Sequence, residues 1–516
     1  MHVRLLYEDC ENLPRNALLN RSEIIQDLNL DIIFKFMARN DKFIYNTVRS
    51  VITNCATDIN TVLYRQAILT DCIKNYNCFS EMYEMTSKAF EEIELYKESV
   101  KKVSVLKLTN SQNVLFSLEI LGILVRNLEK FKMYVDSIET NLTSPGMRAF
   151  YDRLISDYNY EFVEKIKSSL GEMNFLIEGG EITFSGTIGQ GLKAKDIIVN
   201  HLKKLEFRRR KPLSVASIMY YKLFKRSVVL LDDSRISNDV REMEAAGLSH
   251  ILKMYQNFIK ELTTFFENLH YQLSFYVGAA NLQNRLTQMN IPTSMPKVVK
   301  REMGIFRFRG LYDLSMAIYQ RHRPVSNDLD TQDLHLFIIT GANQGGKSTY
   351  LRSIGIAQIL MQSGMFVPAE YYCNCIYDGI FTHFTRREDT AMNSGKLDEE
   401  LNRISRILDN ITPNSMLLLN ESFATTTERE GSQIASDVVN ALYENGTNVL
   451  MVTHLFEFTK AMYEKRPEKS MFLSAERLAD GTRTFRIIEK EPERTSYGLD
   501  LYKDIIGEYD SNDIAN

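Results

Sequence analysis

The sequence contains no tryptophan and only 10 prolines among its 516 residues, and its formal net charge is −4. A nearly balanced charge excludes a protein that is basic throughout, so only a local basic patch could bind nucleic acid. No apolar run approaches the roughly 18 residues that a membrane helix needs. Acidic residues, and no apolar segment, follow Met1–Leu5, so we expect neither a secretory signal nor a membrane partner.

Cysteine is also scarce, and no two cysteines form a C-x-x-C pair. Without such spacing, the sequence indicates neither a zinc site nor a disulfide framework. We therefore expect reduced thiols in a cytoplasmic protein. The six cysteines are Cys10, Cys55, Cys72, Cys78, Cys373 and Cys375.

The apolar pattern changes near residue 300. Before it, apolar residues recur at helical steps, and after it short apolar runs alternate with helices, which is typical of an α/β domain. The sequence predicts a multidomain protein, with an N-terminal segment at 1–30, an α-helical region at 31–300 and an α/β P-loop NTPase domain at 301–516. Shorter helices are predicted at Ile24–Met37, Phe43–Asn75, Phe79–Thr109 and Ser111–Leu170.

The clearest predicted helix covers Ser237–Gln288, where apolar residues recur every three or four positions. About fifty helical residues would span roughly 75 Å. Such a rod indicates a lever or a coiled-coil arm. The alternative is two shorter core helices that break near Gly278.

A small glycine-rich insertion near 178–212 interrupts the helical region. Gly179–Gly189 alternates polar and apolar residues, which predicts a hairpin or a short strand pair. Residues 203–226 then carry nine positive charges against one negative charge. Such a segment suits contact with a phosphate backbone, and a solvated charged face is an equally good interpretation. The candidate nucleic-acid residues are Lys203, Lys204, Arg208, Arg209, Arg210 and Lys211.

The segment Gly341–Thr349 fits G-x-x-x-x-G-K-[ST] in full, between an apolar run at Leu334–Thr340 and a predicted helix at Tyr350–Gln362. Strand, glycine loop and helix together predict a phosphate site. Lys347 would reach the β- and γ-phosphates of ATP, and the Ser348 hydroxyl would hold Mg²⁺. The candidate nucleotide-binding residues are Gly341, Asn343, Gly345, Gly346, Lys347, Ser348 and Thr349.

Polar residues follow two later apolar strands. The strand at Ser415–Leu419 ends in Asn420 and Glu421, where a Walker B element belongs. Glu421 is the candidate base that activates water, while Asn420 is a candidate metal ligand that brings no charge to Mg²⁺. His454, after the strand at Asn448–Thr453, is a candidate partner of the γ-phosphate.

These motifs resemble the ATPase domain of the MutS mismatch-repair family. Thr340–Arg352 looks like the family's TGPN-x-GGKSTYLR loop, and similar segments follow in the family's order across about residues 301–505. They are Phe366–Glu370, Asp378–Thr382, Asn420-Glu421, Thr453-His454 and Ser496–Leu499. A fainter resemblance to the start of the family's core and lever region covers Asp58–Asn75, with Thr61, Arg65 and Gln66.

The resemblance implies an α-helical core and lever followed by an ATPase domain. It also implies a homodimer through the ATPase domains, in which each ATP lies between Lys347 of one chain and the Ser394 loop of the other. Departures from the family pattern are Asn420 in place of aspartate, Ser422–Thr427 in place of GRGTS, and a reduced signature at Ser394–Leu397. Neither the family's mismatch-reading domain before the core nor a nuclease domain after Leu499 is expected.

The sequence therefore predicts a MutS-like ATPase that hydrolyses ATP to gate binding of mismatched, branched or distorted DNA, and Asn420 leads us to expect slow turnover. Two alternatives stay open. One is a ribosome- or RNA-associated factor of the same family. The other is a scaffold that hydrolyses ATP weakly and is switched between states by the bound nucleotide.

Overall fold

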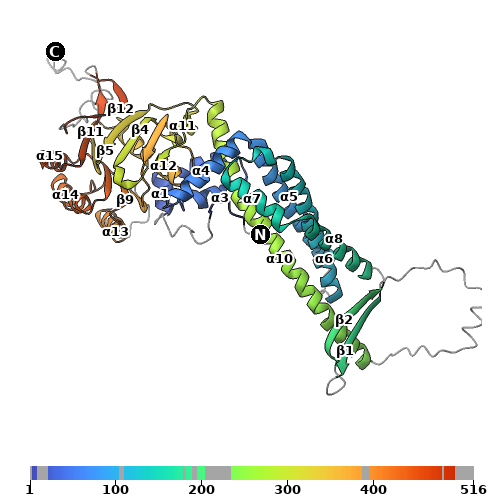
Figure 1. Ribbon diagram of the computed structural model, residues 1–516. Helices are drawn as coiled ribbons and strands as arrows, with labels where there is room; N and C mark the ends of the chain where they lie inside the picture. Colours follow the sequence, from blue (N-terminus) through green and yellow to red (C-terminus); the bar gives the residue numbers. More distant parts are fainter. Residues whose placement is uncertain are drawn as a thin grey trace, which may run out of the picture. The chain divides into compact units, whose positions relative to one another are not determined.

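The computed structural model describes residues 3–8, 21–103, 110–177, 181–188, 194–203, 234–385, 396–465, 467–478 and 481–493. The chain forms a helical N-terminal region followed by mixed α/β sheets (Figure 1). It divides into two compact units, of which the first comprises 1–3, 80–142 and 147–271 and the second 4–79, 143–146 and 272–516. The boundary predicted near residue 300 lies inside the second unit, and the domain division drawn from the sequence stays a prediction.

The first unit is a bundle of helices held by aromatic packing. Tyr158 packs edge-on against Phe265 at 5.2 Å between ring centroids, and Phe131 packs against Phe150 at 6.4 Å. All four side chains are buried. The helices that contribute to this unit are α5 (Tyr76–Val103), α6 (Asn110–Ser137), η1 (Glu139–Asn141), α7 (Pro145–Asp157), α8 (Tyr160–Ile177) and α10 (Ser234–Gln288).

A two-stranded antiparallel sheet also belongs to the first unit. It pairs β1 (Glu181–Ile188) with β2 (Ala194–Lys203). The sequence correctly predicts extended structure at Gly179–Gly189, but this segment provides one strand and its partner lies further along the chain. Lys203 is the last residue of β2. The other candidate nucleic-acid residues, Lys204, Arg208, Arg209, Arg210 and Lys211, lie outside the described residues.

The predicted long helix is confirmed, since α10 runs through 55 residues without a break. The alternative of a break near Gly278 is wrong. A Cβ at Gly278 would lie 2.8 Å from Val48 Cγ1, so the glycine lets α3 (Lys42–Ile52) pack closely against α10. No helix in the described part of the chain, α10 included, is long and apolar enough to cross a membrane.

Three of the other helices predicted before residue 300 are divided into shorter ones. Asn29 adopts a left-handed conformation with φ of 53° and separates the first two helices. Asp58 accepts a hydrogen bond from the Thr61 N–H at 2.7 Å and so starts a new helix within Phe43–Asn75. The resulting helices are α1 (Arg21–Asp27), α2 (Leu30–Ala38), α3 and α4 (Ile59–Lys74). The predicted helix at Ser111–Leu170 is likewise divided into α6, α7 and α8.

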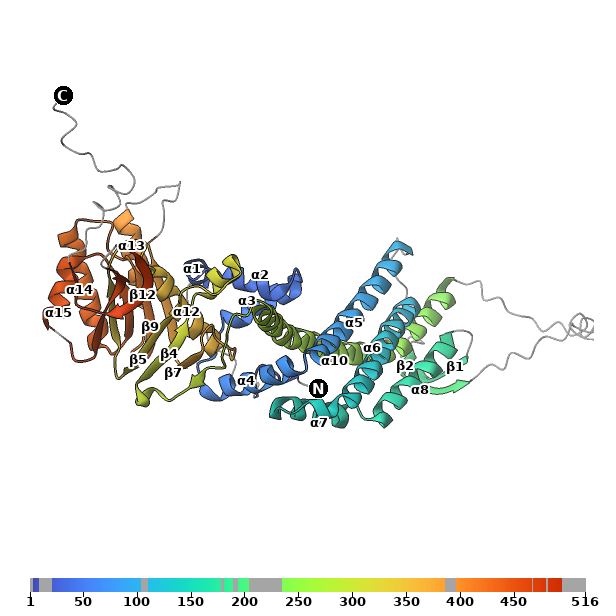
Figure 2. The same cartoon turned by 90° about the horizontal axis from the view of Figure 1, so that it is seen from above.

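The second unit contains a six-stranded sheet in the order β12-β11-β6-β10-β9-β8. Of its strands, β9 and β12 are labelled in Figure 2. All neighbouring strands are parallel except β12, which is antiparallel to β11. The strands are β6 (Leu336–Thr340), β8 (Gly379–Phe384), β9 (Ser415–Asn420), β10 (Asn448–Val452), β11 (Ser470–Arg477) and β12 (Arg483–Glu489). Of these, β6, β9 and β10 confirm the strands predicted at Leu334–Thr340, Ser415–Leu419 and Asn448–Thr453. The helices between them are α12 (Lys347–Gln362), α13 (Lys396–Leu408), α14 (Glu428–Glu444) and α15 (Phe456–Lys465).

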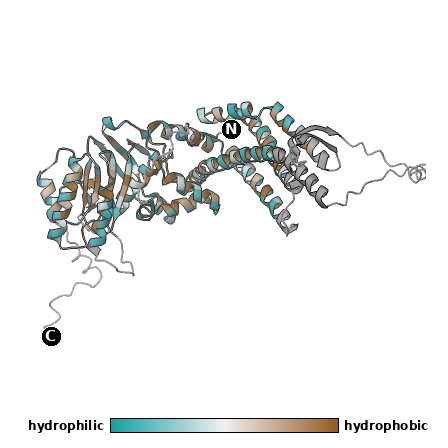
Figure 3. Cartoon of the chain, turned by 90° about the horizontal axis from the view of Figure 1, so that it is seen from below, coloured by the Kyte–Doolittle hydropathy of each residue, from teal (hydrophilic) through white to brown (hydrophobic). Residues whose placement is uncertain are grey.

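Helices cover both faces of this sheet because, apart from polar residues at the strand ends, its central strands β6, β9 and β10 are apolar on both faces. Leu417 and Leu419 pack in one cluster with Val439 of α14. Leu418 points to the other face, where a Cβ at Gly355 of α12 would lie 2.6 Å from its Cδ1. The brown strands between the more hydrophilic outer surfaces of the helices are visible in Figure 3.

A second, four-stranded sheet has the order β3-β7-β4-β5. Of its strands, the sequence predicts only β7, near Cys373–Asp378, and the observed strand begins two residues earlier. Strand β4 pairs antiparallel with both β5 and β7. The elements are β3 (Lys297–Val298), η3 (Arg301–Met303), β4 (Ile305–Leu311), α11 (Leu314–Gln320), β5 (Asn327–Gln332) and β7 (Tyr371–Asn374).

Candidate active site

The glycine loop lies between β6 and α12, in the strand–loop–helix context that the sequence predicts. Gly341 has φ of 109° and Gly346 has φ of 92°, both in the region that favours glycine. A Cβ at Gly341 would lie 2.8 Å from the Ala475 nitrogen, so a side chain there would collide with β11. The loop therefore packs tightly on the sheet and presents the unpaired N–H groups at the start of α12, which suit an anion.

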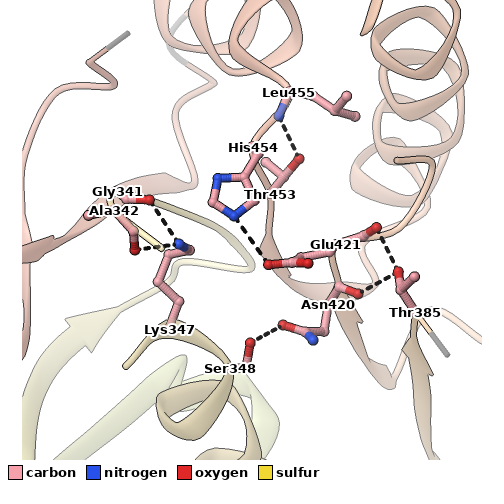
Figure 4. A network of polar contacts seen from close by, with 10 residues as sticks. All are labelled: Gly341, Ala342, Lys347, Ser348, Thr385, Asn420, Glu421, Thr453, His454 and Leu455. Carbon is pink, nitrogen blue, oxygen red and sulfur yellow. Dashed lines mark hydrogen bonds and ion pairs between the residues drawn. The ribbon is translucent and has the colours of Figure 1, made fainter. Parts of the chain in front are cut away.

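Lys347 is the first residue of α12, and its side chain is only 4% exposed. Its Nζ donates hydrogen bonds to the carbonyl oxygens of Gly341 and Ala342, both at 2.8 Å (Figure 4). Burial lowers the pKa of Lys347 to about 8, while the nearby charge of Glu421 acts in the opposite direction. A phosphate group beside this ammonium would favour its charged form.

The two candidate metal ligands lie side by side, since Ser348 Oγ donates a hydrogen bond of 2.8 Å to Asn420 Oδ1. Both groups offer an oxygen atom as a ligand, which is what Mg²⁺ prefers. The pair fits an ion that keeps several water molecules and takes further oxygens from phosphates. Neither side chain brings a negative charge, so the donor set is weaker than one with a carboxylate.

Glu421 and His454 form the second half of the site. His454 Nε2 lies 3.1 Å from Glu421 Oε1 (Figure 4). The hydrogen bond from His454 is the main cause that holds the pKa of Glu421 below its usual value, against the opposing effect of burial. The carboxylate is thus ionised and oriented. The predicted His454 contact with the γ-phosphate stays a prediction, and its visible partner is the candidate base.

Sheet register explains why these residues meet. Val452 of β10 pairs with Asn420 of β9 in parallel, so the residues that follow both strands emerge at the same edge. Glu421 has φ of 57°, an uncommon conformation for a residue with a side chain. The Glu421 N–H donates to the Val452 carbonyl at 2.8 Å, and the Glu421 carbonyl accepts from Thr385 Oγ1 at 2.8 Å. These two bonds hold the strained backbone in place.

A cavity of about 520 Å³ opens beside the glycine loop. Of the predicted nucleotide-binding residues, Asn343 and Gly345–Thr349 line it, as does Glu421, while Gly341 lies behind them. Ser394 lies outside the described residues. Sequence reasoning missed the rest of the lining, which includes Tyr312, Met316, Gln320, His322, Arg323, Pro324, Val325 and Phe485.

One of the missed residues organises the cavity wall. Asp313 is 1% exposed, caps α11 by accepting from the Met316 N–H at 3.0 Å, and accepts from Arg352 Nε of α12 at 2.5 Å. It therefore ties the wall at α11 to the helix that follows the glycine loop. No apolar periodicity or known motif surrounds Asp313, so the sequence offered no signal for it.

Comparison with known proteins agrees with this architecture. The family model described as MutS domain V matches residues 337–506, and the model described as MutS2 N-terminal domain matches residues 57–289. The chain belongs to the MutS family. The two matches together cover the helical region and the sheet that carries the glycine loop.

Several MutS relatives share this similarity. The chain is 33% identical over 185 residues to the DNA mismatch repair protein MutS of Thermus aquaticus, which covers 36% of this chain and 22% of that protein. The MutS proteins of Petrotoga mobilis and Aquifex pyrophilus are 24% and 22% identical over 457 and 472 residues, covering 80% and 86% of this chain. The chain spans about half the length of these two relatives, 54% and 53%.

The segment Ser422–Thr427, where the sequence departs from the MutS pattern after β9, is held by hydrogen bonds to α13. Phe423 is fully buried, and its N–H donates to the carboxylate of Glu400 on α13. The Thr425 hydroxyl donates to the other oxygen of the same carboxylate. Glu400 therefore holds in place the loop that follows Glu421. The MutS-like segment Ser496–Leu499 lies outside the described residues.

Proposed function

We propose that this chain hydrolyses ATP and that ATP gates its binding to mismatched, branched or distorted DNA, in DNA repair or recombination control. The observation that carries the proposal is the convergence of Lys347, Ser348 and Glu421 on one cavity, with Asn420 hydrogen-bonded to Ser348. Membership of the MutS family supports the choice of ATP and DNA, since relatives named DNA mismatch repair proteins match over much of this chain.

In this proposal, the glycine loop and Lys347 bind the phosphates of ATP. The Lys347 ammonium exchanges its two carbonyl partners for β- and γ-phosphate oxygens, which removes the cost of its burial. Ser348 and Asn420 hold Mg²⁺, which neutralises charge on the phosphate oxygens. The cavity walls at α11 and Phe485 receive the nucleoside.

Glu421 orients the attacking water and takes its proton. The water oxygen forms a bond to the γ-phosphorus, and the bond from that phosphorus to the ADP oxygen breaks. His454 is a positioning residue, because its hydrogen bond keeps Glu421 ionised and aimed. Such a base contributes about 10² to 10⁴-fold to the rate.

Two chains would close on ATP through their ATPase domains, with the Ser394 loop of one chain completing the site of the other. This part of the proposal rests on family membership. The long helix α10 would then transmit closure to the DNA-binding region, because an unbroken helix moves as a rigid rod.

The decisive experiment measures DNA binding of the purified chain with and without ATP and Mg²⁺. The ligands are homoduplex, mismatched duplex, a four-way junction, single-stranded DNA and ribosomes. We expect ATP to change the affinity for mismatched or branched DNA, and Glu421→Gln to hold the protein in the ATP-bound state because it binds ATP but hydrolyses it slowly. ATP-independent binding, or ribosomes as the only ligand, would overturn the proposed function.

A further inference from the structure

Three helix C-termini meet on the second unit and carry an arginine each. Arg39 follows the end of α2, Arg321 follows the end of α11, and Arg285 lies in the last turn of α10. A shallow groove of about 760 Å³ opens beside Arg39 and Arg285, and Arg321 lies near enough for its charge to act on Arg285. Its lining residues are Ile32, Lys35, Phe36, Arg39, Asn40, Arg285, Gln288 and Ile318.

The positive charge of this basic groove is not balanced by nearby carboxylates. Among the described residues, only Lys35 of the lining cations has a salt bridge, to Asp31 at 2.6 Å. Arg39 donates to the Tyr76 hydroxyl at 3.4 Å, and Arg285 donates to the Phe36 carbonyl at 3.0 Å. Burial, together with the charges of Arg39 and Arg321, holds the pKa of Arg285 below its usual value.

Helix dipoles account for only part of this arrangement. A helix C-terminus carries about half a negative charge, so three of them compensate about half of three guanidinium groups. The backbone conformation does not explain why arginine stands at positions 39 and 321 either. Arg39 has φ of 48° and Arg321 has φ of 59°, positions at which helices usually end in glycine or asparagine. A side chain at these positions is strained, and its identity needs another explanation.

We propose that the basic groove binds an acidic segment of a partner protein, with an apolar side chain of that segment packed against Ile32 and Ile318. Ile32 is 36% exposed, and Ile318 also lines the groove, so its floor is apolar between cations. Arginine pairs well with carboxylates because its planar fork matches two oxygens.

A nucleic acid fits the groove less well. Of the lining residues, Phe36 is the aromatic one, and the Arg285 guanidinium lies 3.5 Å above its ring centre. The ring face on which a base would stack is therefore already covered. The groove is also separate from the ATP cavity, although α11 contributes Ile318 to the first and Met316 to the second.

The test is fluorescence anisotropy of the full chain with a short labelled peptide of aspartate and glutamate interrupted by two leucines. The matched probe replaces the acids by their amides. The key variant is Arg39→Gly/Arg321→Gly, because glycine suits both left-handed positions and keeps the fold, which a thermal melt checks. Lys253→Gln/Lys260→Gln removes two exposed charges elsewhere on α10 as a control.

We expect the acidic peptide to bind the wild type and the lysine control equally, and the glycine variant about tenfold more weakly, from the loss of one exposed cation that lines the groove, Arg39, and one beside it, Arg321. Equal binding to the glycine variant would overturn the proposal, as would equal binding of the amide peptide. If instead single-stranded or duplex DNA displaces the peptide and loses affinity in the same variant, the groove is a nucleic-acid site and the proposal is wrong.

Discussion

At the scale of single residues, the buried ammonium of Lys347 carries a measurable cost. Its folded-state pKa of about 8 lies below the ordinary value of 10.5, so the unfolded chain binds more protons between these values. The cost, up to about 3 kcal/mol, is therefore complete below pH 8 and disappears as pH rises toward 10.5. A phosphate would remove it at neutral pH, so the cost contributes to selective binding of an anion.

We expect Lys347→Met to abolish ATP hydrolysis and to change how stability depends on pH. Relative to this variant, the wild type should gain stability as pH rises from 8 toward 10.5. Urea denaturation of both proteins at pH 7 and near pH 10 measures the difference. The exposed Lys460→Met serves as a control, and a difference that does not change with pH would show that Lys347 is not a buried cation.

His454 acts on the rate through the pKa of Glu421. Its hydrogen bond is the largest cause that lowers this pKa, so Glu421 remains an ionised base to a lower pH than it otherwise would. We expect His454→Ala to raise the pKa of Glu421 and to move the acid limb of the pH–rate profile to higher pH. His335→Ala, at a histidine that stacks on Tyr443 instead, should leave the limb in place. An unmoved limb in His454→Ala would remove His454 from this role.

Asn420 holds the metal position without a charge, and its Oδ1 already bonds the Ser348 hydroxyl. We expect Asn420→Asp to lower the Mg²⁺ concentration that gives half-maximal ATP hydrolysis, because a carboxylate attracts the cation more strongly. Repulsion between the new aspartate and Glu421 acts the other way, and the bound Mg²⁺ should offset it. A Mg²⁺ titration of both proteins decides, and an unchanged or higher half-point would mean a differently built metal site.

At the scale of elements, one buried carboxylate joins two segments far apart in the sequence. Asp71 of α4 is 2% exposed and accepts from the Thr143 N–H at 2.8 Å, the Ser144 N–H at 2.6 Å and the Thr143 hydroxyl at 2.6 Å. These residues immediately precede α7, which begins at Pro145. Asp71 therefore fixes the start of α7 on α4.

We expect Asp71→Ala to lower the free energy of unfolding by about 1 to 3 kcal/mol, because it leaves the buried Ser144 N–H and the Thr143 N–H and hydroxyl without their acceptor. Urea denaturation followed by circular dichroism measures the loss. Asp152→Ala, at an exposed aspartate of α7, should change it by less than about 0.5 kcal/mol. If both variants lose the same stability, Asp71 does not hold this junction.

Elements differ in how well local patterns predict them. The helix α10 is predictable because apolar residues recur at helical steps along its whole length. The strand β5 is not, although its burial alternates with period two, because its buried residues include Asn327 and Thr331. Asn327 Oδ1 accepts from the Ile487 N–H of β12, a partner 160 residues away. Strands that bury polar side chains against distant partners leave no apolar alternation to read.

At the scale of the whole molecule, the charged segment at 203–226 is the sequence's candidate for DNA contact. Reversing Arg208, Arg209 and Arg210 to glutamate should weaken binding to every DNA tested. Each lost phosphate contact should also reduce the slope of log affinity against log salt by about 0.9 for duplex DNA. Reversal of three exposed lysines elsewhere, Lys88, Lys165 and Lys260, gives the control. Unchanged affinity and slope would favour a solvated face.

The sequence by itself determined the phosphate loop, the Walker B strand with Asn420 and Glu421, and the long helix α10. Each is written in neighbouring residues or in a repeating step, so backbone preference and local burial suffice to specify it. Only the tertiary structure decided that Glu421 meets His454, that Glu400 fixes the following loop and that Arg39 and Arg285 line one groove. These contacts join residues from separate elements, and their geometry follows from sheet register and helix packing.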